Sequence, residues 1–399
     1  MRALRVVKAL RPPRVHASAL GSDHRQVSEG DERTHMALHG GGGSRPDRTV
    51  SPLAQVQQEP RLPYPDGWFA VATSDEVPPG KVVTRRLAGA DVVLYRTRGG
   101  RLRAVGPHCP HLGAHLGHGG RVDGEELVCP FHHFRFDAQG SCVATGYGTP
   151  PPKARLTAVE CRELDDMIFV WRHSLGEPPS WEIEPLPPAG FAKPYCGRHV
   201  RLDHPQEVIE NIVDYGHFYP IHGYAHEVIE EPTFEAERLQ TVTRLRSERS
   251  RFKVASTTPA SKVLIQGLGV VRVQVDSEQF GGFRARVWFC VTPVDPLRVE
   301  IRSSVALRCE NRLVHRLAPA IARAYVWAAW RDTSEDVPIW EHKIYLDRPR
   351  LAKGDGPIMP FRRWASQFYT EPHPALARPE RGPRRRAAEP EGDLAGGGS

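Results

Sequence analysis

The chain has 399 residues, 40% hydrophobic and 25% charged, which is long enough for two domains with separate cores. Its formal net charge is +7, but most of this charge lies near the two ends. Residues 1–50 contain nine Lys and Arg against five Asp and Glu, and residues 378–399 contain five against four, so these two segments account for +5. A basic face for nucleic acid on the folded part is therefore not expected.

The sequence predicts a protein of the reducing cytoplasm. Its seven cysteines are odd in number and mostly scattered, unlike a secreted disulfide framework. The first residues, MRALRVVKAL, lack a signal-peptide cleavage site. No run reaches the roughly 18 apolar residues of a membrane span, since even the stretch from Leu317 to Trp330 contains Arg323.

In chain order, residues 1–60 are rich in Arg, Gly, Ser and Pro and are predicted to be a disordered tail, within which Met36 is an alternative start. Residues 61–175 then show short runs of Val, Leu and aromatic residues separated by Gly and Pro. This pattern predicts a small all-β domain with loops between its strands.

Residues 176–373 are predicted to form a second domain after a Pro-rich connector. The segment EVIENIVDYGHFYPIHG (207–223) is expected to be helical, and the alternating segments LIQGLGVVRVQV, FRARVWFCVTPV and RVEIRSSVAL to be strands. A long helix is expected to begin near Asn311. The fold class is therefore α+β, with an antiparallel sheet packed against this helix, and residues 374–399 are expected to be a disordered tail.

Two short clusters in the loops of the first domain carry metal-ligand chemistry: Cys109-Pro-His111 and Cys129-Pro-Phe-His132. A Cys₂His₂ zinc site uses the same atoms, but zinc fingers usually pair Cys with Cys and His with His. One Cys and one His in each cluster favour a Rieske [2Fe–2S] centre, in which one iron takes both cysteines and the other both histidines. The spacing leaves His115, His118 and His133 as solvated loop residues.

The segment around Asp214, His217 and His222 suggests a second metal site. Asp214 and His217 are three residues apart and would share one face of the expected helix. Pro220 is expected to end that helix at Tyr219, so that His222 turns back toward the same metal. Two His residues and one carboxylate form the facial triad of non-haem Fe(II) oxygenases.

The two motifs, in this order, resemble the α subunits of Rieske non-haem iron oxygenases over about residues 62–370. The resemblance implies a helix-grip catalytic domain in which His217, His222 and a carboxylate from the long helix bind the iron. That carboxylate matches Asp336, with Glu335 as its nearest rival. The resemblance also implies a head-to-tail homotrimer, in which Asp214 links His217 of one chain to His132 of the partner subunit.

The closing stretch, residues 336–369, resembles the branch that contains ketosteroid hydroxylases and cholesterol 7-desaturases. It implies hydroxylation or desaturation of a sterol-like substrate with O₂, in an apolar pocket sized for fused rings. Trp327 and Trp330 are expected to belong to the core rather than to this pocket. Because the chain has no credible nucleotide or flavin fingerprint, electrons are expected to come from NAD(P)H through a separate reductase or ferredoxin.

Two other protein classes fit parts of the sequence. One is a Rieske electron carrier without oxygenase activity, and the other is a zinc-stabilised lipid-binding protein. Iron content separates them, since we expect about three Fe per chain for the oxygenase, about two for the carrier and none for the zinc protein.

Overall fold

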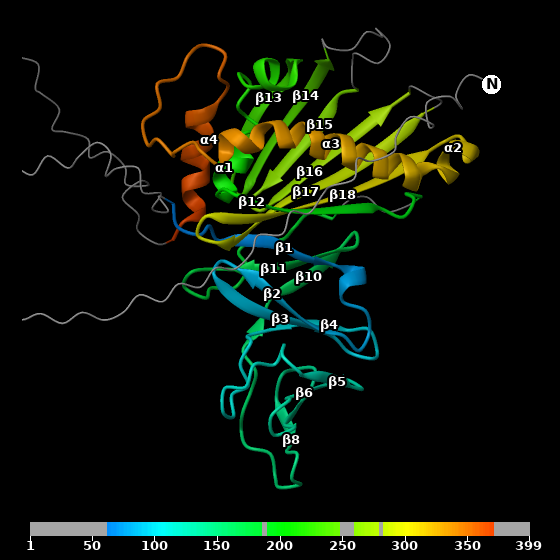
Figure 1. The fold of residues 1–399 in the computed structure, drawn as a ribbon, viewed down its shortest axis with the longest axis vertical. Coiled ribbons are helices and arrows are strands. Elements are labelled where there is room, and N and C mark those ends of the chain that lie inside the picture. Colours follow the sequence, from blue (N-terminus) through cyan, green and yellow to red (C-terminus); the bar gives the residue numbers. More distant parts are fainter. Residues whose placement is uncertain (1–61, 186–189, 248–258, 279–281, 371–399) are drawn as a thin grey trace, which may run out of the picture. The chain divides into compact units, whose positions relative to one another are not determined.

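The computed structural model describes residues 62–185, 190–247, 259–278 and 282–370 (Figure 1). These described residues all belong to one compact unit. The two predicted disordered tails lie outside the described residues. None of the described helices is long and apolar enough to cross a membrane.

The N-terminal part of the described chain contains three small antiparallel sheets. β1 (Gly67–Thr73) and β11 (Met167–Arg172) pair at the centre of the first, and all seven residues of β1 are buried. A strand covered on both faces has no polar alternation, which explains the apolar run GWFAVAT. The remaining strands are β10 (Cys161–Leu164) in the first sheet, β2 (Val82–Leu87), β3 (Ala90–Arg96), β4 (Leu102–Val105) and β9 (Ala158–Val159) in the second, and β5 (Arg121–Asp123), β6 (Glu126–Val128), β7 (Arg135–Phe136) and β8 (Cys142–Ala144) in the third.

The C-terminal part is built on one antiparallel sheet with the order β12-β18-β17-β16-β15-β14-β13. Figure 1 shows α3 lying across this sheet. The expected α+β class, with a sheet packed against a long helix, is therefore confirmed. The strands are β12 (Tyr195–Leu202), β13 (Tyr224–Glu235), β14 (Arg238–Ser247), β15 (Ser261–Gln266), β16 (Val270–Ser277), β17 (Phe283–Asp295) and β18 (Arg298–Cys309).

The long helix begins where the sequence predicts, with one interruption. Asn311 caps the short helix α2 (Arg312–Arg316) by accepting hydrogen bonds from the Leu313 and Val314 amides. A new helix, α3 (Ala318–Trp340), then starts with a proline in its first turn. The small residues Ala318 and Ala322, together with Val326, pack α3 against β18.

The helix expected over residues 207–219 is much shorter, so this part of the prediction is wrong. α1 (Pro205–Glu210) ends after six residues, and a separate π-helical turn spans Phe218–His222. Pro220 lies inside this turn rather than after a helix. It is tolerated because the first N–H groups of any helical turn have no partner within it. Gly223, at φ +68°, ends the turn.

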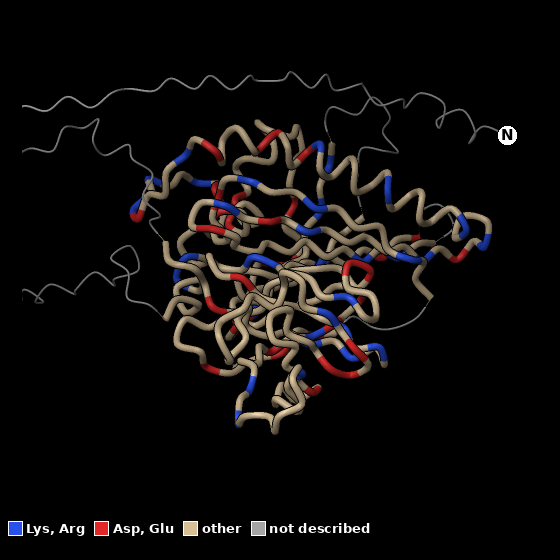
Figure 2. The backbone as a smooth tube through the Cα atoms, turned by 60° about the horizontal axis from the view of Figure 1, so that its bottom comes forward, with Lys and Arg blue, Asp and Glu red and all other residues tan. Residues whose placement is uncertain are grey.

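The two parts of the described chain are joined by buried contacts around β1. The Thr292 hydroxyl of β17 donates to the Ala70 carbonyl at 2.7 Å. Trp68 and Trp288 belong to the same apolar cluster, and Arg302 pairs with Glu76 at 2.6 Å. Figure 2 shows acidic and basic residues interspersed along the described chain. The helix α4 (Ile358–Ala365) completes the core beside α1.

Candidate metal centres

The first centre is formed by the loops that carry the two Cys/His clusters. The Cys109 and Cys129 side chains are buried, at 3% and 2% exposure, and the His111 and His132 rings lie edge to face with centroids 4.7 Å apart. Burial, and then the neighbouring Cys129 thiol, raise the pKa of Cys109 to about 11, despite an opposing backbone hydrogen bond. Without a metal the Cys109 sulfur is therefore a thiol at neutral pH, and metal binding would release its proton.

The donor atoms of this centre fit a two-metal cluster better than a single ion. The Nδ1 atom of His132 is buried and has no hydrogen-bond partner. Among the described residues, only one set of three or more His, Cys, Asp and Glu side chains is close enough to hold a single ion. That set is His217, His222 and Asp336, and it does not include these four residues. A tetrahedral zinc site would bring all four Cys and His ligand atoms around one point. A [2Fe–2S] cluster spreads its two cysteines and two histidines over two irons.

The neighbouring histidines are not all solvated, as the sequence analysis expected. The His115 ring is only 20% exposed, and its Nε2 atom lies 3.2 Å from Asp91 Oδ2. Its Nδ1 atom accepts a hydrogen bond from the Gly117 amide at 3.1 Å. His115 therefore has a structural role in the cluster loop, through a contact between segments that the sequence does not place together.

The second centre brings together His217, His222 and Asp336, as the sequence analysis expected. One ligand atom from each lies within 4.8 Å of the others. His217 precedes the π-helical turn, His222 ends it, and Asp336 comes from α3. The wide turn, not a helix broken by Pro220, brings the two His side chains to one point. His222 Nε2 and Asp336 Oδ1 are 3.2 Å apart.

Both imidazole rings are held in orientation by contacts of Nδ1, the nitrogen that points away from the place where the three side chains meet. His217 Nδ1 lies 2.6 Å from the carbonyl oxygen of Asp214, and 3.9 Å from its carboxylate Oδ2. His222 Nδ1 lies 3.2 Å from Glu335 Oε2. Glu335 thus contacts the Nδ1 side of the His222 ring, and Asp336 contacts its Nε2 side. Each ring presents Nε2 inward, as metal-ligating histidines with oriented outer nitrogens do.

The electrostatics of the second centre favour a bound cation. Burial alone would lower the pKa of His222, but Asp336 and Glu335 together raise it above its usual value. Burial raises the pKa of Asp214, partly offset by the nearby His217. Acidic groups that here stabilise a proton on His222 would equally stabilise a metal ion in its place.

Asn211 is a member of this centre that the sequence analysis missed. Its Nδ2 atom lies 3.2 Å from His217 Nε2 and donates to Asp336 Oδ2 at 3.3 Å. Asn211 caps the C-terminus of α1, and the contact with Asp336 joins positions 125 residues apart. This contact depends on how α3 packs against the sheet, so the sequence around Asn211 contained no signal for it.

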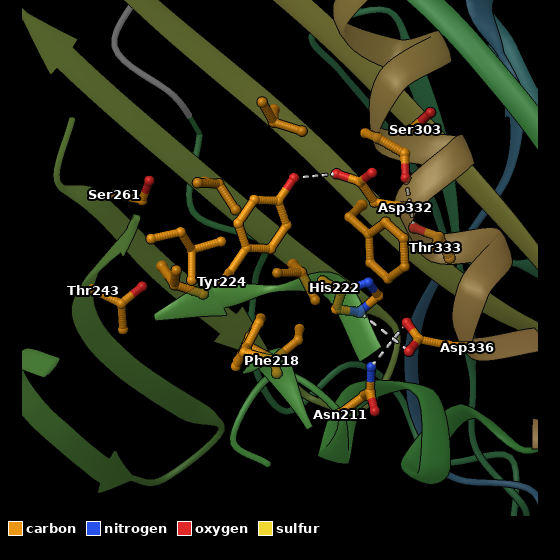
Figure 3. A pocket seen from close by; sticks show the side chains of 18 of the residues that line it. Asn211, Phe218, His222, Tyr224, Thr243, Ser261, Ser303, Asp332, Thr333 and Asp336 are labelled. Atoms are coloured by element: carbon orange, nitrogen blue, oxygen red, sulfur yellow. Dashed lines mark hydrogen bonds and ion pairs between the residues drawn. The ribbon is translucent and has the colours of Figure 1, made fainter. Parts of the chain in front are cut away.

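A cavity of about 350 Å³ opens from the second centre between the sheet and α3 (Figure 3). Most of its walls are apolar, from β15, β16, β17 and the π-helical turn. Trp330 packs against the core, as expected, but it also lines the cavity, so its exclusion from the cavity is corrected. Trp327 is 57% exposed and belongs to neither the core nor the cavity. The lining residues beyond the metal centre include Val208, Ile212, Phe218, Val263, Val271, Val273, Val287, Phe289, Val305, Val326 and Trp340.

A few polar groups also face the cavity. The Tyr224 hydroxyl donates to Asp332 Oδ2 at 2.8 Å (Figure 3). Burial, and then Asp332, raise the pKa of Tyr224 to about 12, so this phenol stays protonated near neutral pH. Ser303 accepts a hydrogen bond from the Trp330 indole at 3.2 Å.

Comparisons with known families cover both parts of the chain. Residues 67–160 match the Rieske [2Fe-2S] domain family, and residues 170–369 match the 3-ketosteroid 9alpha-hydroxylase C-terminal domain family. The second match contains the π-helical turn and α3.

Curated relatives and a solved structure agree with these matches. The cholesterol 7-desaturase nvd 1 of Ciona intestinalis is 31% identical over 342 residues, covering 78% of this chain and 70% of the relative. The oxygenase component of 3-ketosteroid-9-alpha-monooxygenase from Rhodococcus rhodochrous is 23% identical, covering 76% and 84%. Dicamba monooxygenase bound to 3,6-dichlorosalicylic acid has the same fold, with a TM-score of 0.58 and 17% identity, covering 76% of this chain and 96% of that one.

These matches establish the cofactors and the class of reaction. The chain uses a Rieske [2Fe–2S] cluster and a mononuclear iron, and it receives electrons from a separate protein. It is an oxidoreductase of the oxygenase and desaturase type. The chain belongs to the Rieske non-haem iron oxygenases, in the branch that contains the cholesterol 7-desaturases and the ketosteroid 9-alpha-monooxygenases.

Proposed function

We propose that this oxygenase hydroxylates or desaturates a C–H bond of a sterol- or steroid-like substrate. The observation that carries the proposal is the apolar cavity of about 350 Å³ that ends at His217, His222 and Asp336. Ligand cavities of this size and character take largely apolar small molecules. The names of the relatives, which act on cholesterol and on a 3-ketosteroid, support the same substrate class.

We assign the metal ligands as follows. Cys109 and Cys129 bind one iron of the cluster, and His111 and His132 bind the other. His217, His222 and Asp336 bind the mononuclear iron, with the first two binding through Nε2. When bound, the cluster supplies single electrons, and the mononuclear iron supplies the means to reduce O₂ and oxidise the substrate.

The surrounding residues orient these ligands and shape the cavity. The Asp214 carbonyl oxygen and the Glu335 carboxylate each fix the outer nitrogen of a ligating imidazole. Asn211 contacts His217 Nε2 and Asp336 Oδ2. The apolar walls limit the access of water to the substrate, which favours oxidation of the C–H bond over side reactions.

We further propose that electrons reach the iron from the cluster of a second copy of the chain. The Asp214 carboxylate is 38% exposed and lies 3.9 Å from His217 Nδ1, so one side of it remains open to another molecule. In a head-to-tail homotrimer, it would join His217 to His132 of the partner subunit. Residues 61–175 would then form the cluster domain and residues 176–373 the catalytic domain. The separate electron donor would be an NAD(P)H-dependent reductase or a ferredoxin.

Turnover by the iron-loaded protein with a generic reductase tests the substrate class. Sterols, 3-ketosteroids and small aromatic acids are compared at equal concentration, and products are identified by mass spectrometry. We expect oxygen uptake coupled to a hydroxylated or desaturated product with the fused-ring compounds. Preferential oxidation of the aromatic acids would contradict the proposal.

A further inference from the structure

Asp332 is a carboxylate in the wall of the cavity with no cationic partner among the described residues. It lies on α3, and Tyr224 donates a hydrogen bond to its Oδ2 at 2.8 Å. Asp336, one turn further along the helix, is matched instead by His222. Asp332 therefore has acceptor capacity that the protein leaves open.

An open acceptor in an apolar wall favours a ligand that provides a donor. A partly buried carboxylate accepts several hydrogen bonds, and leaving a site for one unmade costs free energy. Tyr224 supplies one, and the apolar side chains of the cavity wall, such as Val273, Val287 and Phe289, supply none. A carboxylate can only accept, so it attracts a substrate hydroxyl and repels a carbonyl oxygen.

Asp332 lies close to the proposed iron ligands. Asp332 and Asp336 are four residues apart on a continuous helix, which separates their backbones by about 6 Å along its axis. Figure 3 shows the Tyr224–Asp332 pair facing the same space as His222. A substrate group held by Asp332 therefore lies close to the C–H bond that is oxidised.

We infer that Asp332, held in place by Tyr224, selects a substrate with a hydroxyl group, rather than a carbonyl group, close to the oxidised C–H bond. The hydroxyl donates to the open oxygen of Asp332, while the apolar remainder of the molecule lies along β15, β16 and β17. This inference rests on the proposed sterol-oxidising function and goes further, because it separates sterol alcohols from ketosteroids.

The other hydroxyl groups of the cavity, which include those of Ser303 and Tyr325, are neutral and do not make this distinction. Thr241 and Thr333 donate to the carbonyl oxygens of Glu230 and Ala329. Thr243 and Ser261 are paired across β14 and β15 and are labelled away from His222 and Asp336 in Figure 3. A neutral hydroxyl can donate or accept, so it would tolerate an alcohol and a ketone equally.

Binding of a matched ligand pair to the metal-loaded protein tests the inference. The pair is a saturated sterol alcohol and the ketone that differs from it at the ring oxygen alone. The wild type should bind the alcohol at least about tenfold more tightly, the usual effect of one hydrogen bond to a charged group. Asp332→Asn presents an amide that can donate to the ketone, so the ratio should fall to about one or reverse.

Two further variants control for general damage to the cavity. Thr243→Val removes a lining hydroxyl elsewhere and should change the affinities for both ligands together, leaving their ratio intact. Tyr224→Phe keeps the carboxylate but removes the hydrogen bond that holds it, so the preference for the alcohol should persist at a reduced size. An unchanged thermal unfolding profile, together with retained iron at the second centre, verifies that the cavity of each variant is folded.

The possible results separate the two proposals. If the wild type binds and oxidises both ligands equally, or if Asp332→Asn keeps the full preference, the hydroxyl selection is wrong and the sterol-oxidising function stands. If neither ligand binds or is oxidised, the proposed function itself is wrong.

Discussion

The two metal centres use the chain in different ways. The proposed cluster ligands lie in two neighbouring loops, and each loop closes locally, as Cys109 N donates to the Ala114 carbonyl and Cys129 N to the Phe134 carbonyl. The iron centre joins a short π-helical turn to a helix more than a hundred residues later. The first centre therefore depends on loop geometry, and the second on the packing of α3 against the sheet.

This difference predicts that the centres can be broken separately. A change in the cluster loops should leave the second cavity intact, and a change on the π-helical turn should leave the loops intact. Residues that orient ligands should have smaller effects than the ligands. The following predictions proceed from the largest expected effect to the smallest.

Replacing His222 with Ala should abolish substrate oxidation, with a loss of at least about a thousandfold. The variant retains one imidazole and one carboxylate, too few to hold the iron in a facial triad. The visible spectrum of the cluster should be unchanged, because its proposed ligands lie in other loops. Turnover assays and absorption spectra check this, and loss of the cluster colour would contradict the separation of the centres.

Replacing His111 with Cys should convert the Rieske spectrum into a ferredoxin-like one. A thiolate in place of a neutral imidazole adds negative charge and lowers the potential of the cluster by several hundred millivolts. Electron paramagnetic resonance and potentiometry measure both changes. His115→Ala, in the same loop, is the matched control and should retain a Rieske signal, although its lost contact with Asp91 weakens the loop.

Replacing Asp214 with Asn should slow electron transfer between the centres by about a hundredfold or more while both remain loaded. The change nearly preserves the shape and removes the charge next to His217. The Asp214 carbonyl oxygen that orients this ring is retained. Single-turnover oxidation of the reduced cluster, with substrate and O₂ present, measures the rate. Transfer as fast as in the wild type would exclude Asp214 from the electron path.

Replacing Glu335 with Gln should weaken iron binding about tenfold, the usual effect of losing a carboxylate that orients a ligating histidine. Its neighbour provides the matched comparison, since Asp336→Asn removes a proposed ligand and should lose the iron. Competition with a chelator measures both affinities. If Glu335→Gln proves the more damaging change, Glu335 is the third ligand.

The smallest effect concerns Asp203, which precedes α1. Burial, partly offset by a hydrogen bond from the His204 amide, raises the pKa of Asp203 to about 7. The folded state thus retains a proton that the unfolded state has lost, so this residue lowers stability as the pH rises from about 4 to 7. Asp203→Asn should flatten this part of the stability profile. Thermal unfolding at several pH values tests it, and an unchanged slope would contradict it.

The sequence predicted most of the fold because its strands and long helix follow clear patterns of burial. It failed at residues 211–222, where the apolar spacing of a helix continues but the chain turns twice. His217 and His222 were singled out by their spacing and Asp336 by resemblance, and the three side chains lie together. Asn211, Asp332 and the position of Trp330 could not be predicted, since they depend on which face of α3 meets the sheet. The assigned ligand roles remain predictions.

The iron content of purified wild type and of His222→Ala tests the central claim most directly. With electron paramagnetic resonance to count the clusters, the account predicts about three iron atoms per chain in the wild type. It predicts about two in the variant, with an undiminished Rieske signal in both. Equal iron content in the two proteins, or loss of the Rieske signal in the variant, would contradict the account of two independent metal centres.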